Sequence, residues 1–180
     1  IVDDVFEKDT FESSLIEVED IKKGYLKHLL SIIDISVIKK SKLSVAVDSL
    51  NGATGRFLPD LMHSCGIKTT AIRQERDVFF GNKAPITGPN SLSNLSKITV
   101  KNKCDLGIAC DADGDGFGIV DSSGKWISPN EIIALILEHL LENRKMKASK
   151  ICRNVVTSHI LDVVCKKYGL TVRETPIGFN

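Results

Sequence analysis

Apolar residues in this chain form short continuous runs, separated by stretches in which they recur every three or four positions. The short runs predict buried β-strands over residues 44–48, 67–72, 106–110, 151–156 and 171–175. The stretches with helical spacing predict helices over residues 16–33, 58–65, 92–98, 132–140 and 158–168. Strands and helices therefore alternate along most of the sequence.

Residues that start or stop helices lie at the edges of these stretches. Ser128-Pro129-Asn130-Glu131 combines an N-cap serine, a proline at the first helical position and a glutamate three residues after the serine. We expect Ser91 to cap the helix that follows it, and Gly66 to end the helix before it. Residues 121–125 predict a hairpin turn, and residues 73–90 predict a long loop that is either functional or disordered.

The alternation of strands and helices predicts an α/β protein with two mixed or parallel α/β modules. We expect the first module over residues 1–122, with an N-terminal connector at 1–14, and the second over residues 123–180. The second module has only two or three strands, and no helix follows the last one to cover it. Because a parallel sheet is buried on both faces, we expect this module to be incomplete and the chain to be a fragment of a longer protein.

Composition removes several classes of function. Of the 180 residues, 42% are hydrophobic and 26% charged, and the formal net charge of +1 gives no argument for nucleic acid or an anionic membrane as a partner. No apolar run is long enough to span a bilayer. The five cysteines form no CxxC pair and lie mostly in apolar segments, which favours reduced, buried thiols and a cytoplasmic protein. From the acidic residues at its start we expect no signal peptide.

Chemistry is concentrated in Asp111-Ala112-Asp113-Gly114-Asp115-Gly116, directly after the apolar run at 106–110. Three like charges at alternate positions repel one another unless a cation neutralises them. The small residues between them allow a tight turn that gathers the carboxylate oxygens. Oxygen ligands of this kind suit hard divalent cations, and three of them would leave about three positions of a Mg²⁺ octahedron for water and a phosphate oxygen. We therefore predict that Asp111, Asp113 and Asp115 bind Mg²⁺ for phosphoryl transfer.

Two other interpretations of this turn remain open. Asp and Gly are common in solvated surface turns, which need no ligand. The pattern also matches the first six positions of a calcium-binding helix-loop-helix, including Gly116. However, the twelfth position of that loop should be Glu and is Ser122, and apolar strands rather than helices are expected on both sides.

The acidic turn and its flanks resemble the metal loop of the α-D-phosphohexomutases, the phosphoglucomutases and phosphomannomutases. The similar segments are Leu106–Ala109, the three aspartates, Gly118–Asp121, the strand and turn Val47–Ala53, Ser128–Glu131, Thr157-Ser158 and Thr175–Phe179. They occur in the family's order and cover most of the chain. The resemblance implies the second of the family's four domains and the first part of the third.

The resemblance also implies an activity for the parent protein. Members interconvert hexose 1-phosphates and hexose 6-phosphates through a phosphoserine in the first domain, which lies outside this chain. The metal ligands would be Asp111, Asp113 and Asp115, and Gly178, Phe179 and Asn180 would lie in the loop that binds the sugar phosphate. The implied partners are a phosphosugar and the missing first, remaining third and fourth domains, with no nucleic acid and no membrane. We expect this fragment to be inactive alone.

Two positions depart from the family pattern. The family usually has Arg directly after the third Asp, where it contacts phosphate, and this chain has Gly116. The family usually has Lys after the Gly-aromatic pair, and this chain has Asn180. Because both changes remove a cation from a site for a dianion, we expect weakened or altered mutase activity. The alternative function is a non-catalytic family member that acts as a scaffold or regulatory module.

Four further features carry weaker signals. The turn Asn51–Gly55 follows a strand and could cradle a phosphate, although a tight structural turn is the simpler interpretation. His159 stands at a strand-to-helix junction and is a candidate for proximity to substrate. Trp126 is expected to pack beside the hairpin. Arg73 and Arg76 are expected to be exposed loop charges, with contact to a neighbouring domain as the alternative.

Overall fold

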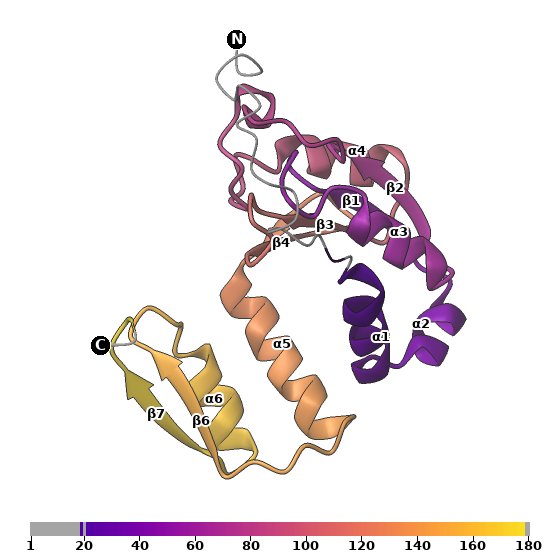
Figure 1. Ribbon diagram of the computed structural model, residues 1–180. Helices are drawn as coiled ribbons and strands as arrows, with labels where there is room; N and C mark the ends of the chain where they lie inside the picture. Colours follow the sequence, from indigo (N-terminus) through magenta and orange to yellow (C-terminus); the bar gives the residue numbers. More distant parts are fainter. Residues whose placement is uncertain (1–18, 20, 179–180) are drawn as a thin grey trace, which may run out of the picture. The chain divides into compact units, whose positions relative to one another are not determined.

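The computed structural model describes residue 19 and residues 21–178 (Figure 1). The chain divides into two units, 1–37 and 38–180. The described part of the first unit contains helix α1 (Lys22–Ile32), and helix α2 (Ile35–Ser41) crosses the division between the units. Helix α1 confirms the helix predicted at 16–33 over residues 22–32. Residues 19, 21 and 33 are not helical, and residues 16–18 and 20 lie outside the described residues.

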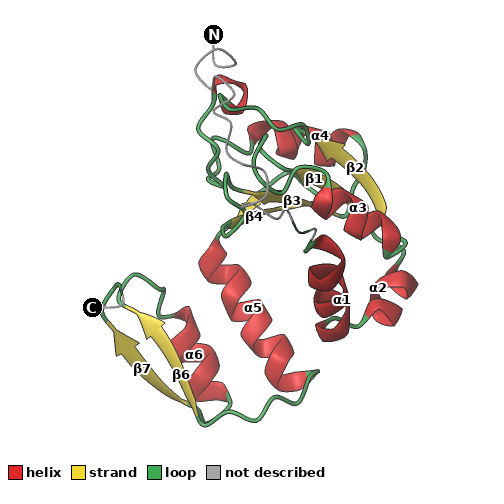
Figure 2. Cartoon of the chain, in the orientation of Figure 1, coloured by secondary structure: helices red, strands yellow, loops and turns green. Residues whose placement is uncertain are grey.

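The second unit contains a five-stranded mixed sheet in the order β2-β1-β3-β4-β5 (Figure 2). Its strands are β1 (Ser44–Asp48), β2 (Lys68–Ile72), β3 (Leu106–Cys110), β4 (Phe117–Asp121) and β5 (Trp126–Ile127). Both β2 and β3 pair in parallel with β1, whereas β4 and β5 continue the sheet as antiparallel hairpins. The alternating pattern therefore predicted the parallel part, and the tight turns at 111–116 and 121–125 produce the antiparallel part.

Helices α3 (Phe57–Ser64) and α4 (Ser93–Lys101) connect the parallel strands. From β1 the chain passes through α3 to β2 on one side, and it then returns through α4 to β3 on the other side of β1. Such a reversal places a crevice at the carboxyl ends of the two adjacent strands, which is where ligands bind in open α/β sheets. Here those strands are β1 and β3, so the turn after Asp48 and the turn after Cys110 flank this crevice.

The core of this sheet lies between its strands and α4. Ala46, Ala109 and Val120 from three adjacent strands are fully buried against Leu92 and Leu95. Because Leu92 is completely buried, it fixes where α4 begins: the helix starts at Ser93, and Leu92 occupies the N-cap position without a side-chain hydrogen bond. The prediction that Ser91 caps this helix is therefore wrong.

A buried ion pair joins β1 to the long loop that follows β2. The Asp48 side chain is fully buried, and its Oδ1 and Oδ2 accept hydrogen bonds from Nε and Nη2 of Arg73 at 2.9 and 2.5 Å. Asp48 Oδ1 also accepts from the backbone N–H of Leu50. Arg73 itself is only 16% exposed, so the prediction that it is an exposed loop charge is wrong. Its partner lies 25 residues earlier in the chain, beyond the reach of any local pattern.

A second, two-stranded parallel sheet consists of β6 (Lys150–Asn154) and β7 (Thr171–Thr175), joined by α6 (Ile160–Lys167). Helix α5 (Pro129–Glu142) and α6 form one core with this sheet, built on Ala134, Leu137, Leu161 and Cys165. Beside that core, the buried Arg153 pairs with Asp162 of α6 and Glu174 of β7. The predicted capping box at Ser128 and Glu131 is present at the start of α5.

The sequence-based elements otherwise agree closely with the structure. The strands at 44–48, 106–110 and 171–175 have the predicted bounds, and Gly66 follows the end of α3 with a φ of +79°. The loop predicted at 73–90 contains one short 3₁₀ helix, η2 (Phe80–Asn82). Helix α2 was not predicted. The prediction of buried thiols is confirmed for Cys65, Cys104 and Cys165 and is wrong for Cys152, which is exposed on β6. No helix in the described part of the chain is long and apolar enough to cross a bilayer.

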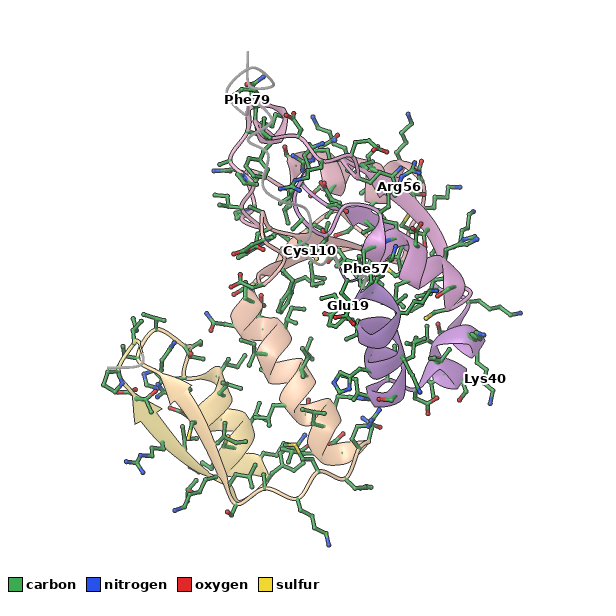
Figure 3. The ribbon with its side chains drawn as sticks, viewed as in Figure 1. Glu19, Lys40, Arg56, Phe57, Phe79 and Cys110 are labelled. Atoms are coloured by element: carbon green, nitrogen blue, oxygen red, sulfur yellow. The ribbon has the colours of Figure 1, made fainter. Side chains whose placement is uncertain are left out.

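We expect the buried Asp48–Arg73 pair to contribute to the stability of the fold. We expect Arg73→Ala to lower the free energy of unfolding by about 3–5 kcal/mol, because it leaves a buried carboxylate without its partner. Arg56→Ala is the matched control, since Arg56 (labelled in Figure 3) pairs with Glu75 at the surface, with both side chains more than 60% exposed. It should cost about 0–1 kcal/mol. Urea unfolding of both variants measures the difference, and equal losses would contradict the buried-pair account.

Candidate metal centre

The three predicted ligands gather in the tight turn between β3 and β4. Figure 3 labels Cys110, the last residue of β3, and the acidic turn begins with the next residue. The antiparallel pairing continues into the turn, where the N–H of Asp111 donates to the carbonyl of Gly116 at 3.1 Å. One oxygen from each of Asp111, Asp113 and Asp115 lies within 4.8 Å of the others. Three aspartates at alternate positions of the sequence therefore bring their carboxylates together in the folded turn.

Backbone amides hold the first of these carboxylates in place. Oδ1 of Asp111 accepts hydrogen bonds from the N–H groups of Gly114 and Gly116, both at 3.0 Å. Gly114 has a φ of +86°, a conformation that glycine adopts without strain. Asp111 is partly buried, whereas Asp113 and Asp115 are exposed. The turn therefore has one fixed carboxylate at its base and two that face solvent.

Mutual repulsion makes this turn a suitable cation site. The charges of Asp113 and then Asp111 raise the pKa of the Asp115 carboxyl above its ordinary value. A divalent cation bound by all three would relieve this repulsion, and its preferred ligands are the oxygens that the turn provides. The donor set therefore fits a hard cation such as Mg²⁺. Strands, not helices, flank the turn, which distinguishes it from a calcium-binding helix-loop-helix.

The loop after β1 packs directly against the acidic turn. The N–H of Ala53 donates to the carbonyl of Ala112 at 2.8 Å. Gly52 lies so close that a Cβ there would meet the carbonyl oxygens of Ala112 and Asp111 at 2.6 and 2.9 Å. Glycine is therefore required at position 52 for the two loops to touch. The turn at Asn51–Gly55, weighed above as a phosphate cradle, here acts as a structural support for the carboxylates.

This supporting loop is conformationally strained. Leu50 and Asn51 have φ values of +47° and +59°, a region that costs most residues energy. The Leu50 side chain is almost fully buried in the core, and Asp48 accepts its N–H, so packing and a hydrogen bond offset the strain. Sequence reasoning missed this feature, because neither residue is a glycine. Strained backbone of this kind concentrates at functional sites.

An open cleft of about 690 Å³ lies beside the carboxylates. Its lining residues are Ala53, Arg76, Pro85, Ile86, Thr87, Asp111, Ala112 and Asp113. They come from the supporting loop, the acidic turn and the long loop predicted at 73–90. That loop is therefore one wall of the candidate site. Arg76 is exposed as predicted, but its place in the wall of this cleft was not foreseen.

Gly116 is closely packed against the first carboxylate. A Cβ at this position would lie 2.1 Å from Oδ2 and 2.9 Å from Cγ of Asp111. The Asp111 carboxylate thus occupies the space that any side chain at position 116 would need. In this structure the turn provides three anions and no cation of its own.

The remaining predicted candidates lie beside the second sheet, after β7 and at the start of α6, or outside the described residues. Gly178 follows β7 with a φ of +96° and no atom within 4 Å of a Cβ built there. Phe179 and Asn180, predicted with it to bind the sugar phosphate, lie outside the described residues. His159 is 80% exposed at the start of α6, where its Nδ1 lies 2.7 Å from Asp162. Their roles in substrate binding stay predictions.

Trp126 connects the hairpin to the long loop. Its Nε1–H donates to the carbonyl of Thr87 at 3.0 Å, and the ring packs against the core of the first sheet. The packing role predicted for this residue is confirmed. The hydrogen bond adds a second function, because it fixes the far end of the cleft wall.

Two family models match consecutive parts of the chain. Residues 23–124 match phosphoglucomutase/phosphomannomutase, alpha/beta/alpha domain II, and residues 128–180 match domain III. The chain belongs to the phosphoglucomutase/phosphomannomutase family. The resemblance drawn from the acidic turn and its flanks is thereby confirmed.

Relatives and solved structures agree with this assignment. A phosphoglucomutase/phosphomannomutase of Thermococcus kodakarensis is 28% identical over 99% of the chain and 40% of its own length. A phosphoglucomutase of Komagataeibacter xylinus is 27% identical over 96% of the chain and 33% of its own length. A family structure from Burkholderia thailandensis shares the fold at 23% identity, with a TM-score of 0.79 over 90% of the chain and 34% of that structure. The chain thus spans well under half of the relatives it matches.

The contact between the two loops makes a second prediction. We expect Gly52→Ala to lower the free energy of unfolding by about 1–3 kcal/mol, because its methyl group would overlap two backbone carbonyls. Gly88→Ala is the control, since no atom lies within 4 Å of a Cβ there. Urea unfolding and Mg²⁺ titration compare the two variants. We expect Gly52→Ala, but not Gly88→Ala, to bind Mg²⁺ more weakly. If Gly52→Ala were as stable as Gly88→Ala, the close contact between the two loops would be refuted.

Proposed function

We propose that this chain supplies the metal-binding part of a phosphohexomutase, a parent enzyme that interconverts hexose 1-phosphates and hexose 6-phosphates. The convergence of Asp111, Asp113 and Asp115 at the carboxyl end of β3 carries the proposal. Membership of the mutase family supports the reaction class. The sugar is left as a hexose phosphate, because relatives include both phosphoglucomutases and phosphoglucosamine mutases.

In this proposal Asp111, Asp113 and Asp115 would hold Mg²⁺, each offering a carboxylate oxygen. Bound there, the ion would screen the charge of a phosphoryl group and polarise it toward attack. The hydrogen bonds from Gly114 and Gly116 would keep Asp111 oriented whether or not the ion is present. Asp111 and Asp113 line the open cleft and Asp115 is exposed, so an ion held by them would be accessible to a phosphate group there.

The phosphoryl donor must come from outside the described part of this chain. A phosphohexomutase needs a phosphorylated side chain that both gives and recovers the phosphoryl group, and we assign this role to a serine of another domain. The openness of the cleft supports this arrangement, since it gives a second domain and a sugar phosphate room to reach the carboxylates. We expect the 180-residue chain alone to show no mutase turnover.

A scaffold or regulatory role is the second candidate. The packing of Gly116 against Asp111 favours it, because this turn has no side chain to counter the charge of a phosphate. A charge-assisted contact to phosphate contributes about 1.5–3 kcal/mol, so its loss would lower substrate affinity markedly. The two candidates differ in turnover and not in Mg²⁺ binding.

Metal binding and turnover by the intact protein test the proposal. We expect Asp113→Asn to weaken Mg²⁺ binding by about 100-fold, since even residues that only orient a ligand contribute 10–100-fold, and to abolish turnover of glucose 1-phosphate. Asp60→Asn is the control, because Asp60 is an exposed carboxylate in the first turn of α3. Isothermal titration with MgCl₂ and a coupled mutase assay give the two readouts.

The outcomes separate the alternatives. Mg²⁺ binding with turnover that Asp113→Asn removes supports the mutase. Mg²⁺ binding without turnover on any hexose phosphate supports the scaffold. Equal Mg²⁺ affinity in Asp113→Asn and Asp60→Asn, or Ca²⁺ binding far tighter than Mg²⁺ binding, would overturn the assignment of the acidic turn.

A further inference from the structure

We propose that Arg76 binds the phosphate group of the sugar phosphate in the cleft beside the three aspartates. This inference rests on the proposed function and adds to it the residue that recognises the substrate's charge. Among the described residues that line the cleft, Arg76 alone carries a positive charge. The other charged residues in that lining are Asp111 and Asp113.

Arg76 differs from Arg73 and Arg56 in its contacts with the described residues. In the part of the chain that the structure describes, its guanidinium makes no ion pair and its side chain is exposed. By contrast, Arg73, three residues earlier, forms an ion pair with Asp48, and Arg56 forms one with Glu75. An unpaired guanidinium presents a planar set of donors that matches two oxygens of a phosphate.

The backbone around Arg76 is fixed relative to the acidic turn. Asn51 accepts the N–H of Asp77 at 3.2 Å through its carbonyl, and its side-chain amide donates to the carbonyl of Glu75 at 2.7 Å. The N–H of Asn51 also donates to the carbonyl of Arg73 at 2.8 Å. One residue therefore holds the chain on both sides of Arg76. The next two residues, Gly52 and Ala53, contact the acidic turn directly.

The rest of this cleft wall is also held in place. The carboxylate of Asp77 accepts the N–H groups of Phe79 and Gly81, both at 2.9 Å, which closes a compact turn after Arg76. At the other end of the loop, Thr87 is bound by Trp126 and packs against Gly118, where a Cβ would lie 2.8 Å from its carbonyl oxygen. The wall is therefore preorganised, and a guanidinium placed on it loses less entropy on binding than one on a free loop.

Charge balance gives the chemical reason for this role. A phosphate dianion that approaches three carboxylates is repelled unless nearby cations neutralise the negative charge. One divalent ion does not neutralise the three carboxylates and the dianion together. Gly116 contributes no side chain to the turn. Arg76 provides the additional positive charge, because it lines the same cleft as Asp111 and Asp113.

Binding measurements on the intact protein test this role. We expect Arg76→Ala to weaken the binding of glucose 1-phosphate by about 10- to 100-fold, the range for a lost charge-assisted phosphate contact, and to leave Mg²⁺ affinity unchanged or tighter. Arg76→Lys should give an intermediate loss, because an ammonium keeps the charge without the paired donors. Arg173→Ala is the control, since Arg173 is an exposed arginine on β7, in the other sheet.

The two titrations distinguish the possible results. Weaker glucose 1-phosphate binding with undiminished Mg²⁺ binding in Arg76→Ala supports the proposal. If Arg76 only screens the carboxylates, Arg76→Ala will bind Mg²⁺ more tightly and glucose 1-phosphate as the unaltered protein does, which overturns the proposal and leaves the proposed function intact. An unaltered protein that binds neither Mg²⁺ nor glucose 1-phosphate overturns both.

Discussion

The candidate site depends on the contact between the loop after β1 and the acidic turn after β3. The hydrogen bond from Ala53 to Ala112 and the side-chain-free surface of Gly52 bring the two backbones together. Asn51 extends the same contact to the long loop through three hydrogen bonds. Three loops from different parts of the sequence thus meet at the carboxyl ends of two adjacent parallel strands, where sheet topology opens a crevice. Without this contact, the carboxylates and Arg76 would not share one cleft.

Stability and function are connected through Asp48. This carboxylate is fully buried, and it holds both the strained turn at Leu50 and the guanidinium of Arg73. A buried ion pair offsets its desolvation only when its hydrogen bonds are well placed, as they are here. The same pair fixes the start of the loop that carries Arg76. The fold therefore neutralises Arg73 inside the protein, whereas Arg76, three residues later, is exposed and lines the cleft.

The sequence predicted much of this arrangement, for physical reasons that can be named. Apolar runs located the strands, and alternation of aspartates with small residues predicted the convergence of three carboxylates, because both are local patterns. The capping box at Ser128 is equally local. By contrast, the Asp48–Arg73 pair and the hydrogen bonds of Asn51 join residues more than 20 positions apart. Ser91 does not cap α4 as predicted, because the burial of Leu92 in the core, which depends on tertiary packing, decides where the helix begins.

The central claim is that Asp111, Asp113 and Asp115 together bind one divalent cation. A crystal structure of the intact protein with Mn²⁺, a Mg²⁺ substitute that can be located by its anomalous scattering, tests it most directly. The account predicts one anomalous peak within about 2.0–2.3 Å of an oxygen from each aspartate, in octahedral coordination completed by water or phosphate. A peak elsewhere, or ordered carboxylates with no peak between them at saturating Mn²⁺, would contradict it.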